Sequence, residues 1–256
     1  MGEYDRLPAL AADLVHAQVA VIAATSTPAA LAAKSATATI PIVFETASDP
    51  IRIGLVARLD RPGGNITGVT QLNVEVLPKR LELLRELVPK ANAMAILINP
   101  TNAALAQTQS KNMLSAAHAL GLDLHVLNAS SERDLEGVFA NVIKLGAGGL
   151  VISADPLFTS WGKQLATLAS RHSVPAAFGW REFAAAGGLL SYGSDATDAY
   201  RLAGVYTGRV LKGEKPGDLA IQQATKVELY VNLKSAKTLG ITIPSTVLAR
   251  ANEVIE

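Results

Sequence analysis

Three apolar segments of the chain end abruptly in small hydroxyl, amide or acidic residues, each just before a predicted helix. They are residues 19–27 (VAVIAATST), 94–102 (MAILINPTN) and 149–155 (GLVISAD). Such segments are typical of parallel strands, whose carboxyl ends lie beside the amino-termini of the following helices, where backbone N–H groups and polar side chains hold small ligands. The pattern predicts an α/β protein that binds a ligand at the edges of its sheets.

Composition excludes several classes of protein. Of 256 residues, 49% are hydrophobic and 18% are charged, with a formal net charge of +1, so nucleic acid and anionic membranes are not expected partners. The absence of cysteine removes disulfides, Cys-based zinc sites and a thiol nucleophile. No apolar stretch reaches the ~18 residues that span a bilayer, and the first residues do not have the order of a secretory signal. We expect a soluble chain without a targeting segment.

Runs rich in β-forming residues alternate with amphipathic ones, which is the pattern of a parallel sheet wrapped by helices. Strands are predicted at residues 19–25, 41–46, 66–70, 93–99, 123–128, 149–154, 174–179 and 189–193. Helices are predicted at residues 4–16, 28–36, 50–58, 77–88, 103–120, 131–145, 158–172, 195–212, 232–239 and 245–254. The chain therefore opens in a helix.

A change of composition after the helix at 77–88 predicts a seam between two Rossmann-like lobes. Pro89 and Lys90 end this helix, and a new strand-helix series starts at Met94. The Gly187-Gly188 turn and the segment KGEKPGD at 212–218 indicate a return to the first lobe. We expect lobe one to comprise residues 1–90 and 190–225, and lobe two residues 91–189 and 226–256.

A set of motifs in fixed order covers nearly the whole chain. It comprises YDRLPALAADLV, TPAALAAK, IPIVFETASDP, GLVARLDRPGGNITGVT, KRLELLRELVPKA, SADPLFTS, WREFAAAGGLLSYG, YTGRVLKGEKPGDLAIQQ, NLKSAKTLG and LARANEVIE. With these motifs the chain resembles the substrate-binding proteins of ABC transporters whose better-studied relatives bind tryptophan and other aromatic amino acids.

The resemblance implies a type I periplasmic binding protein fold, with a ligand held in the cleft between two lobes and no catalysis. It implies a periplasmic location and the membrane subunits of an ABC transporter as partners. Members usually begin with a signal, a strand, a helix and a second strand before the YDRLPAL helix, so lobe one is expected to be truncated at its N-terminus. Three outcomes are open: a truncated product, a lobe completed by a second copy, or a rearranged lobe. Unpaired strand edges also predict self-association.

Hydroxyl groups form the predicted ligand site of lobe one. Thr25, Ser26 and Thr27 end the first strand, and Thr46 and Ser48 follow the next one. Hydroxyls beside helix N–H groups suit a carboxylate. An ordinary N-cap at residues 25–27 and a turn at residues 46–48 remain alternative interpretations.

Asn99 and Asp155 end two strands of lobe two, and the carboxylate of Asp155 suits a ligand ammonium. Helix capping before Pro156 is the alternative. Resemblance to SADP-type segments favours Asp155 as the amine contact, so that a zwitterionic amino acid would bind both lobes. Trp180 and Tyr192 are predicted to line the pocket by ring stacking, whereas other aromatic residues, Phe178 and Phe183, are expected in the core.

Enzymatic interpretations find little support in the same residues. Neither the LGAGG segment at 145–149 nor the RPGGN segment at 61–65 has the context of a nucleotide-binding loop. The four histidines lack metal-ligand spacing, so no metal and no cofactor are expected. Two alternatives remain beside the solute-binding protein: the ligand-sensing core of a transcription regulator, and an α/β enzyme with an unrecognised site.

Overall fold

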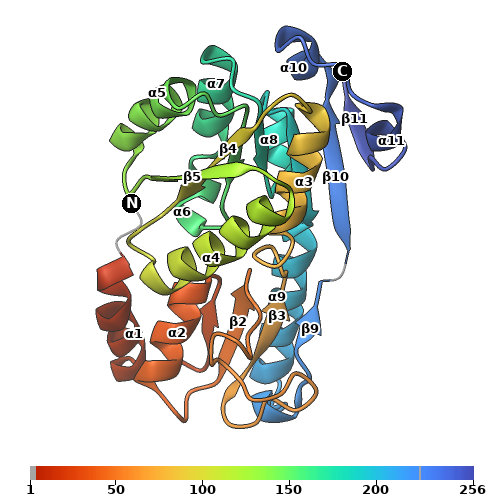
Figure 1. Cartoon of the computed structure of the whole chain (residues 1–256). Helices are drawn as coiled ribbons and strands as arrows, with labels where there is room; N and C mark the ends of the chain where they lie inside the picture. The colour runs from red at the N-terminus through yellow and green to blue at the C-terminus, as the bar shows by residue number, and fades with distance from the viewer. Residues whose placement is uncertain (1–3, 225) are drawn as a thin grey trace. The chain divides into compact units, whose positions relative to one another are not determined.

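The chain forms two compact units, each built from non-contiguous segments. The computed structural model describes residues 4–224 and 226–256. Unit 1 holds residues 76–193 and 227–256, and unit 2 holds the described residues up to 75 and from 194 to 226. The chain therefore passes between the units at 75/76, 193/194 and 226/227. Figure 1 follows these passages by colour along the chain.

Unit 2 contains a four-stranded parallel sheet in the order β1-β2-β3-β9. Its strands are β1 (Ile22–Ala24), β2 (Ile42–Thr46), β3 (Ile66–Thr70) and β9 (Gln222–Gln223). Every residue of β2 and β3 is buried, as expected for parallel strands that are covered on both faces. β1 lies at one edge of this sheet.

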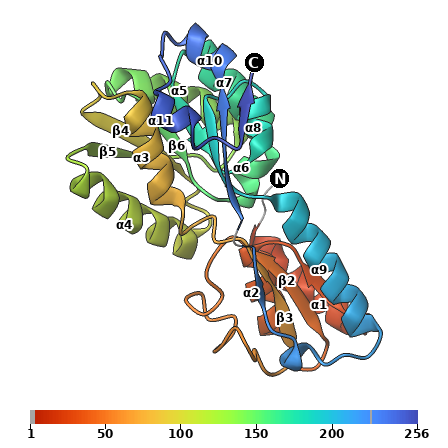
Figure 2. The same ribbon diagram turned by 90° about the vertical axis from the view of Figure 1, so that its right-hand side faces the viewer.

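Helices cover both faces of the unit 2 sheet. They are α1 (Leu7–His16), α2 (Thr27–Ala36) and α9 (Ala196–Leu211), with 3-10 turns at Tyr4–Arg6 and Pro216–Asp218. Phe44 of β2 packs in the same cluster as Ala30 of α2, whereas its neighbour Val43 packs against Tyr206 of α9. Successive strand residues point to opposite faces, so α2 and α9 lie on opposite sides. Figure 2 shows α9 running along this sheet.

Unit 1 contains a seven-stranded sheet in the order β11-β10-β8-β7-β6-β4-β5. Its strands are β4 (Ala93–Ile98), β5 (Asp123–Asn128), β6 (Leu150–Ile152), β7 (Ala176–Phe178), β8 (Leu190–Ser194), β10 (Val227–Asn232) and β11 (Glu253–Ile255). The run from β8 to β5 is parallel, and β10 is parallel to β11. The carboxyl ends of β4, β6, β7 and β8 therefore share one edge.

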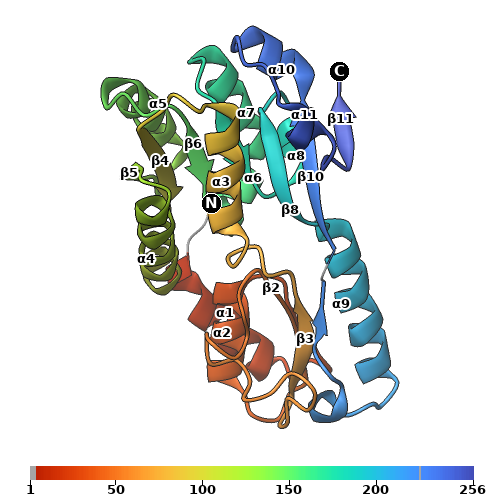
Figure 3. The same cartoon turned by 45° about the vertical axis from the view of Figure 1, so that its right-hand side comes forward.

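The helices of unit 1 follow its strands in the alternating order of an α/β fold. They are α3 (Leu77–Leu87), α4 (Ala103–Ala119), α5 (Leu135–Lys144) after a 3-10 turn at Glu132–Asp134, α6 (Pro156–Ser160), α7 (Gly162–Arg171), α8 (Arg181–Ala185), α10 (Leu233–Thr238) and α11 (Ser245–Leu248). Figure 3 shows α3 beside β8. No helix among the described residues is long and apolar enough to cross a bilayer.

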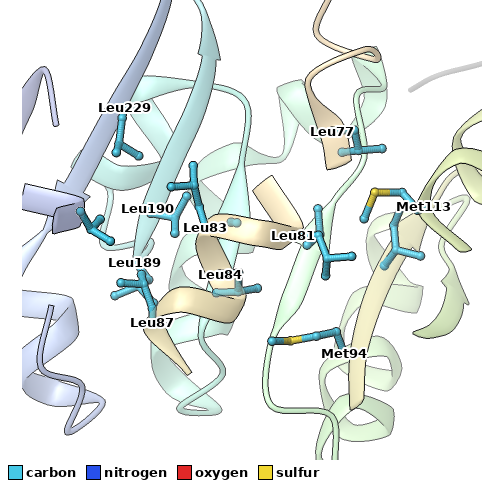
Figure 4. Close-up of a cluster of buried hydrophobic side chains, with 14 of the residues drawn as sticks. Leu77, Leu81, Leu83, Leu84, Leu87, Met94, Met113, Leu189, Leu190 and Leu229 are labelled. Atoms are coloured by element: carbon cyan, nitrogen blue, oxygen red, sulfur yellow. The ribbon is translucent and has the colours of Figure 1, made fainter. Parts of the chain in front are cut away.

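The first helix after the 75/76 passage anchors the core of unit 1. Leu81 and Leu84 of α3 pack with Met94 of β4 and Met113 of α4, and all four side chains are fully buried (Figure 4). Burial of one such side chain contributes ~1.5–3 kcal/mol. The structure therefore groups α3 with unit 1, whereas the composition change placed the seam after it.

Most predicted elements are present, but two predicted helices are wrong. Residues 50–58 form turns instead of a helix, because Gly54 adopts a left-handed φ of +73° that interrupts a right-handed helix. The predicted helix at 245–254 ends at Leu248, and Glu253–Ile255 form β11 instead. The predicted helix at 158–172 is divided into α6 and α7 around Trp161. The strands β9, β10 and β11 and the helix α8 were not predicted.

Candidate functional site

The predicted hydroxyl site lies in unit 2, where β1 and β2 end side by side. Thr27 and Thr46 are both buried, and their Oγ1 atoms are 2.5 Å apart. The Oγ1 of Thr46 also accepts a hydrogen bond from the backbone N–H of Ser48 at 3.2 Å. Because β1 and β2 are parallel neighbours, the residues that follow them reach the same edge of the sheet. The structure therefore brings Thr27, Thr46 and Ser48 together.

Within this group, Ser48 has the hydroxyl that is available to a ligand. Its Oγ is buried and has no hydrogen-bond partner among the residues that the structure describes. A buried hydroxyl without a partner is costly, so a ligand or an ordered water is the expected partner of Ser48. Ser26 instead caps α2, because its Oγ accepts the N–H of Ala29 at 3.4 Å, and the side chain of Thr25 is exposed.

Asp155 occupies the equivalent edge of unit 1, directly after β6. Its buried carboxylate accepts three N–H groups at 3.0–3.2 Å, from the side chains of Asn99 and Asn102 and from the backbone of Leu157. The bond to Leu157 is the N-cap of α6, so capping is one established role of this side chain. The other two bonds join the end of β6 to the end of its neighbour β4.

Two residues around Asp155 were not assigned to the site from the sequence. Asn102 was quoted only as part of the NPTN segment, yet it binds the Oδ2 of Asp155. Gln109 of α4 is buried and donates from Nε2 to the backbone oxygen of Ala154 at 2.8 Å. In the sequence, the available signal for Gln109 was an amide side chain on the predicted helix that follows the NPTN turn. Both side chains fix the loop that carries Asp155.

Trp180 follows the end of β7, whereas Tyr192 is the third residue of the neighbouring strand β8. Both side chains are half-buried. The indole Nε1 of Trp180 donates to the Oγ1 of Thr159 at 2.9 Å, so its polar edge is already paired within the unit. The other aromatic residues that were expected in the core, Phe178 and Phe183, are buried there in T-shaped contact.

Arg80 of α3 is a buried cation beside these aromatic residues that sequence reasoning missed. Its Nε donates to the backbone oxygen of Tyr192 at 2.6 Å. Its guanidinium also fills the space left by Gly179, where a Cβ would lie 2.6 Å from Nη2. Burial lowers the pKa of Arg80 to about 9. Its position on the apolar face of α3, between Leu77 and Leu84, was the available signal.

Glu45 of β2 is a second buried ionisable group that the sequence analysis did not assign. Its Oε1 accepts a hydrogen bond from the Nε2 of Gln71 at 2.6 Å. Burial raises the pKa of Glu45 to about 8, although the bond from Gln71 opposes this effect. In the sequence, the available signal for Glu45 was an acidic residue inside the predicted strand segment IVFET. Among the described residues, no group of three or more His, Cys, Asp or Glu side chains is placed to hold a metal ion.

Comparisons with known proteins agree on one family. The family model for ABC transporter substrate binding proteins matches residues 1–255. A tyrosine-binding protein from Clostridioides difficile (strain R20291) is 27% identical over 234 residues, which cover 91% of this chain and 66% of that protein. The chain thus spans just under two-thirds of the length of this curated relative.

Solved structures show the same architecture. A conserved domain protein from Vibrio cholerae O1 biovar eltor superposes with a TM-score of 0.87 at 28% identity, covering 99% of this chain and 84% of that one. The ABC domain in complex with L-Trp from Streptococcus pneumonia superposes with a TM-score of 0.86 at 27% identity, covering 99% and 87%. The predicted α/β fold of the type I periplasmic binding protein kind is confirmed, and the chain belongs to the family of ABC transporter substrate binding proteins.

Proposed function

We propose that this protein binds an amino acid, preferentially an aromatic one, as the solute-binding component of an ABC importer. The observation that carries the proposal is the buried carboxylate of Asp155, oriented by three N–H donors at the carboxyl edge of a parallel sheet. A carboxylate held in this way is ready to accept charge-assisted hydrogen bonds from a ligand ammonium.

The hydroxyl groups of unit 2 suit the carboxylate end of an amino acid. Ser48 offers a buried hydroxyl that lacks a partner among the described residues, and Thr27 and Thr46 lie beside it. Hydroxyl donors suit a ligand carboxylate. In unit 1, the half-buried rings of Trp180 and Tyr192 offer stacking surfaces to an aromatic side chain. The tyrosine-binding and L-Trp-bound relatives support this preference.

Calorimetry with L-tyrosine, L-tryptophan and L-leucine tests the proposal, using Asp155→Ala and a matched control. Loss of one charged hydrogen bond costs ~1.5–3 kcal/mol, so Asp155→Ala should weaken binding about 10- to 150-fold. Asp195→Ala is the control, because Asp195 is also a helix N-cap, accepting the N–H of Thr197 at 2.8 Å. Equal affinities in the two variants would reject the role of Asp155 as amine contact.

The finer aspects of this function follow from family membership. We infer that the protein binds its ligand without chemical turnover and delivers it to the membrane subunits of an ABC transporter. We also infer a location outside the cytoplasm, which is the periplasm where an outer membrane is present. After prolonged incubation of L-tyrosine and L-tryptophan with the protein, mass spectrometry should detect no reaction product. Cell fractionation should recover the protein outside the cytoplasm, and recovery in the cytosol would contradict the location. Solved structures described as LacI-family regulators are 13% and 15% identical to this chain, and this likeness shows the shared fold alone.

Self-association through the edge of unit 2 belongs to the same proposal. β1 is an edge strand, and no other strand of the described residues pairs with its outer side. Open strand edges are templates for pairing with another chain. Sedimentation velocity should show dimers at high concentration, and Ala23→Lys should reduce them because Ala23 is an exposed residue of β1. A monomer at all concentrations would refute the self-association.

A further inference from the structure

The hydroxyl loop of unit 2 is bonded to a second segment along its whole length. We define the hydroxyl loop as residues 46–49 and the crossing segment as residues 70–75. Four hydrogen bonds join them: Gln71 N–H to Thr46 O at 2.9 Å, Val74 N–H to Ala47 O at 3.0 Å, Thr70 Oγ1 to Ser48 O at 3.0 Å, and Asp49 N–H to Glu75 Oε1 at 3.0 Å. Each of the four residues of the hydroxyl loop is therefore hydrogen-bonded to the crossing segment.

The crossing segment is in turn bonded to Ser194, within the same unit. The Oγ of Ser194 donates to the backbone oxygen of Gln71 at 2.5 Å, and its N–H donates to the Oδ1 of Asn73 at 3.2 Å. The Nδ2 of Asn73 donates to the Oε1 of Gln71 at 2.9 Å, and Gln71 donates to Glu45. All four side chains are buried.

The backbone of the crossing segment is also held in an uncommon conformation. Leu72, between Gln71 and Asn73, has a φ of +52°. A non-glycine residue in the left-handed region is strained and persists only where its surroundings hold it. The bonds on either side of Leu72 supply that restraint.

This bonded set ends at two of the three points where the chain passes between the units. The chain leaves unit 2 after Glu75 and returns to it at Ser194. On the unit 1 side of the same two passages, Arg80 donates to the backbone oxygen of Tyr192 at 2.6 Å. In each unit, hydrogen bonds therefore join the segment beside the 75/76 passage to the segment beside the 193/194 passage.

We propose that Gln71, Asn73 and Ser194 are positioning residues that couple the hydroxyl loop to the 75/76 and 193/194 passages. The coupling rests on the proposed function, because Thr46 and Ser48 are the ligand contacts that it serves. Buried polar groups cannot separate cheaply from their partners, so displacement of the hydroxyl loop by a ligand displaces both passages together. Occupancy of the loop thereby biases the backbone conformation at these two passages.

Hydrogen exchange tests the coupling without a ligand. Ser194→Ala removes the hydroxyl bond to Gln71 O, and we expect about tenfold faster exchange at the amides of Gln71, Val74 and Asp49. Ser194→Thr retains a hydroxyl and should restore slow exchange. Ser235→Ala is the control, because Ser235 Oγ donates to Gly187 O at 2.8 Å in unit 1. Unchanged exchange at Asp49 in Ser194→Ala, or an equal change in Ser235→Ala, would overturn the coupling.

Binding of L-tyrosine and L-tryptophan to the same variants tests the positioning role. Ser194→Ala should weaken binding severalfold through a faster off-rate, and Ser194→Thr should recover it. Faster exchange with unchanged affinity would overturn the positioning role. If the unmodified protein bound neither amino acid, the proposed function would fail, while the exchange measurement would still decide the coupling.

Discussion

Glu45 makes the stability of unit 2 depend on pH in a direction opposite to that of an ordinary acid. Glu45 is 4% exposed, and burial raises the pKa of its carboxyl from 4.5 to about 8. The folded protein therefore keeps this proton up to about pH 8, whereas the unfolded chain releases it near pH 4.5. Because the folded state binds more protons between these values, the free energy of unfolding falls as pH rises.

The magnitude follows from the two pKa values. Their difference of about 3.5, at 1.36 kcal/mol per pKa unit, corresponds to about 5 kcal/mol. This stabilisation is fully present below pH 4.5 and is lost as pH rises through 8. Glu45→Gln keeps the shape and the acceptor for Gln71 but cannot ionise. The variant should match the unmodified protein within ~1 kcal/mol at pH 5. Between pH 5 and pH 9 the unmodified protein should lose about 4 kcal/mol more stability than the variant, because the difference in bound protons persists over about three pH units, from 5 to 8.

Urea unfolding followed by circular dichroism at pH 5, 7 and 9 measures this difference. Glu214→Gln is the control, because Glu214 is exposed and its hydrogen bond with Arg209 lowers its pKa. A lowered pKa affects stability only in acid, so this variant should run parallel to the unmodified protein over the same range. If Glu45→Gln also ran parallel from pH 5 to pH 9, Glu45 would not be the buried neutral acid that the structure indicates.

Two further predictions concern close packing around glycines. Gly68→Ala should destabilise the protein by ~3 kcal/mol or more, because a Cβ there would lie 2.2 Å from the backbone oxygen of Phe44. In Gly137→Ala the new Cβ meets no atom within 4 Å, so this variant should stabilise α5 by ~0.5–1 kcal/mol. Thermal unfolding compares the two variants, and equal effects would contradict the close packing at Gly68. Gly179→Ala should destabilise the protein when Arg80 is present and should be nearly neutral in an Arg80→Ala background. A double-mutant cycle measures this difference. Additive effects of the two substitutions would show that the Arg80 side chain does not fill the space beside Gly179.

Local pattern was sufficient for the parts of the fold that depend on periodicity. The predicted strand at 66–70 coincides with β3, and the predicted strand at 123–128 coincides with β5. β10, with the sequence VELYVN, alternates apolar and polar residues and was detectable by the same rule. β9 and β11 are two and three residues long, so they exist only because a distant strand pairs with them, which no local pattern encodes.

The candidate site could be predicted from the sequence to about the same extent as the fold. Hydroxyl and acidic residues after apolar runs correctly located Thr46 and Asp155 at strand ends, although their ligand roles remain predictions. The partners that hold them come from distant segments: Thr46 O accepts the N–H of Gln71, and Asp155 accepts from Asn102. Arg80 and Glu45 were missed because charge is usually taken as a sign of exposure, and only tertiary packing buried them.

The division of unit 2 into two stretches of chain has a consequence for its synthesis. The β1–β3 layer emerges from the ribosome before most of unit 1, but α9 and β9, which complete it, are translated afterwards. Val43 and Val69 pack against α9 in the finished protein, so a nascent chain that stops before Ser194 leaves that apolar face uncovered. This interval during translation is when aggregation competes with folding and when a chaperone would engage the chain.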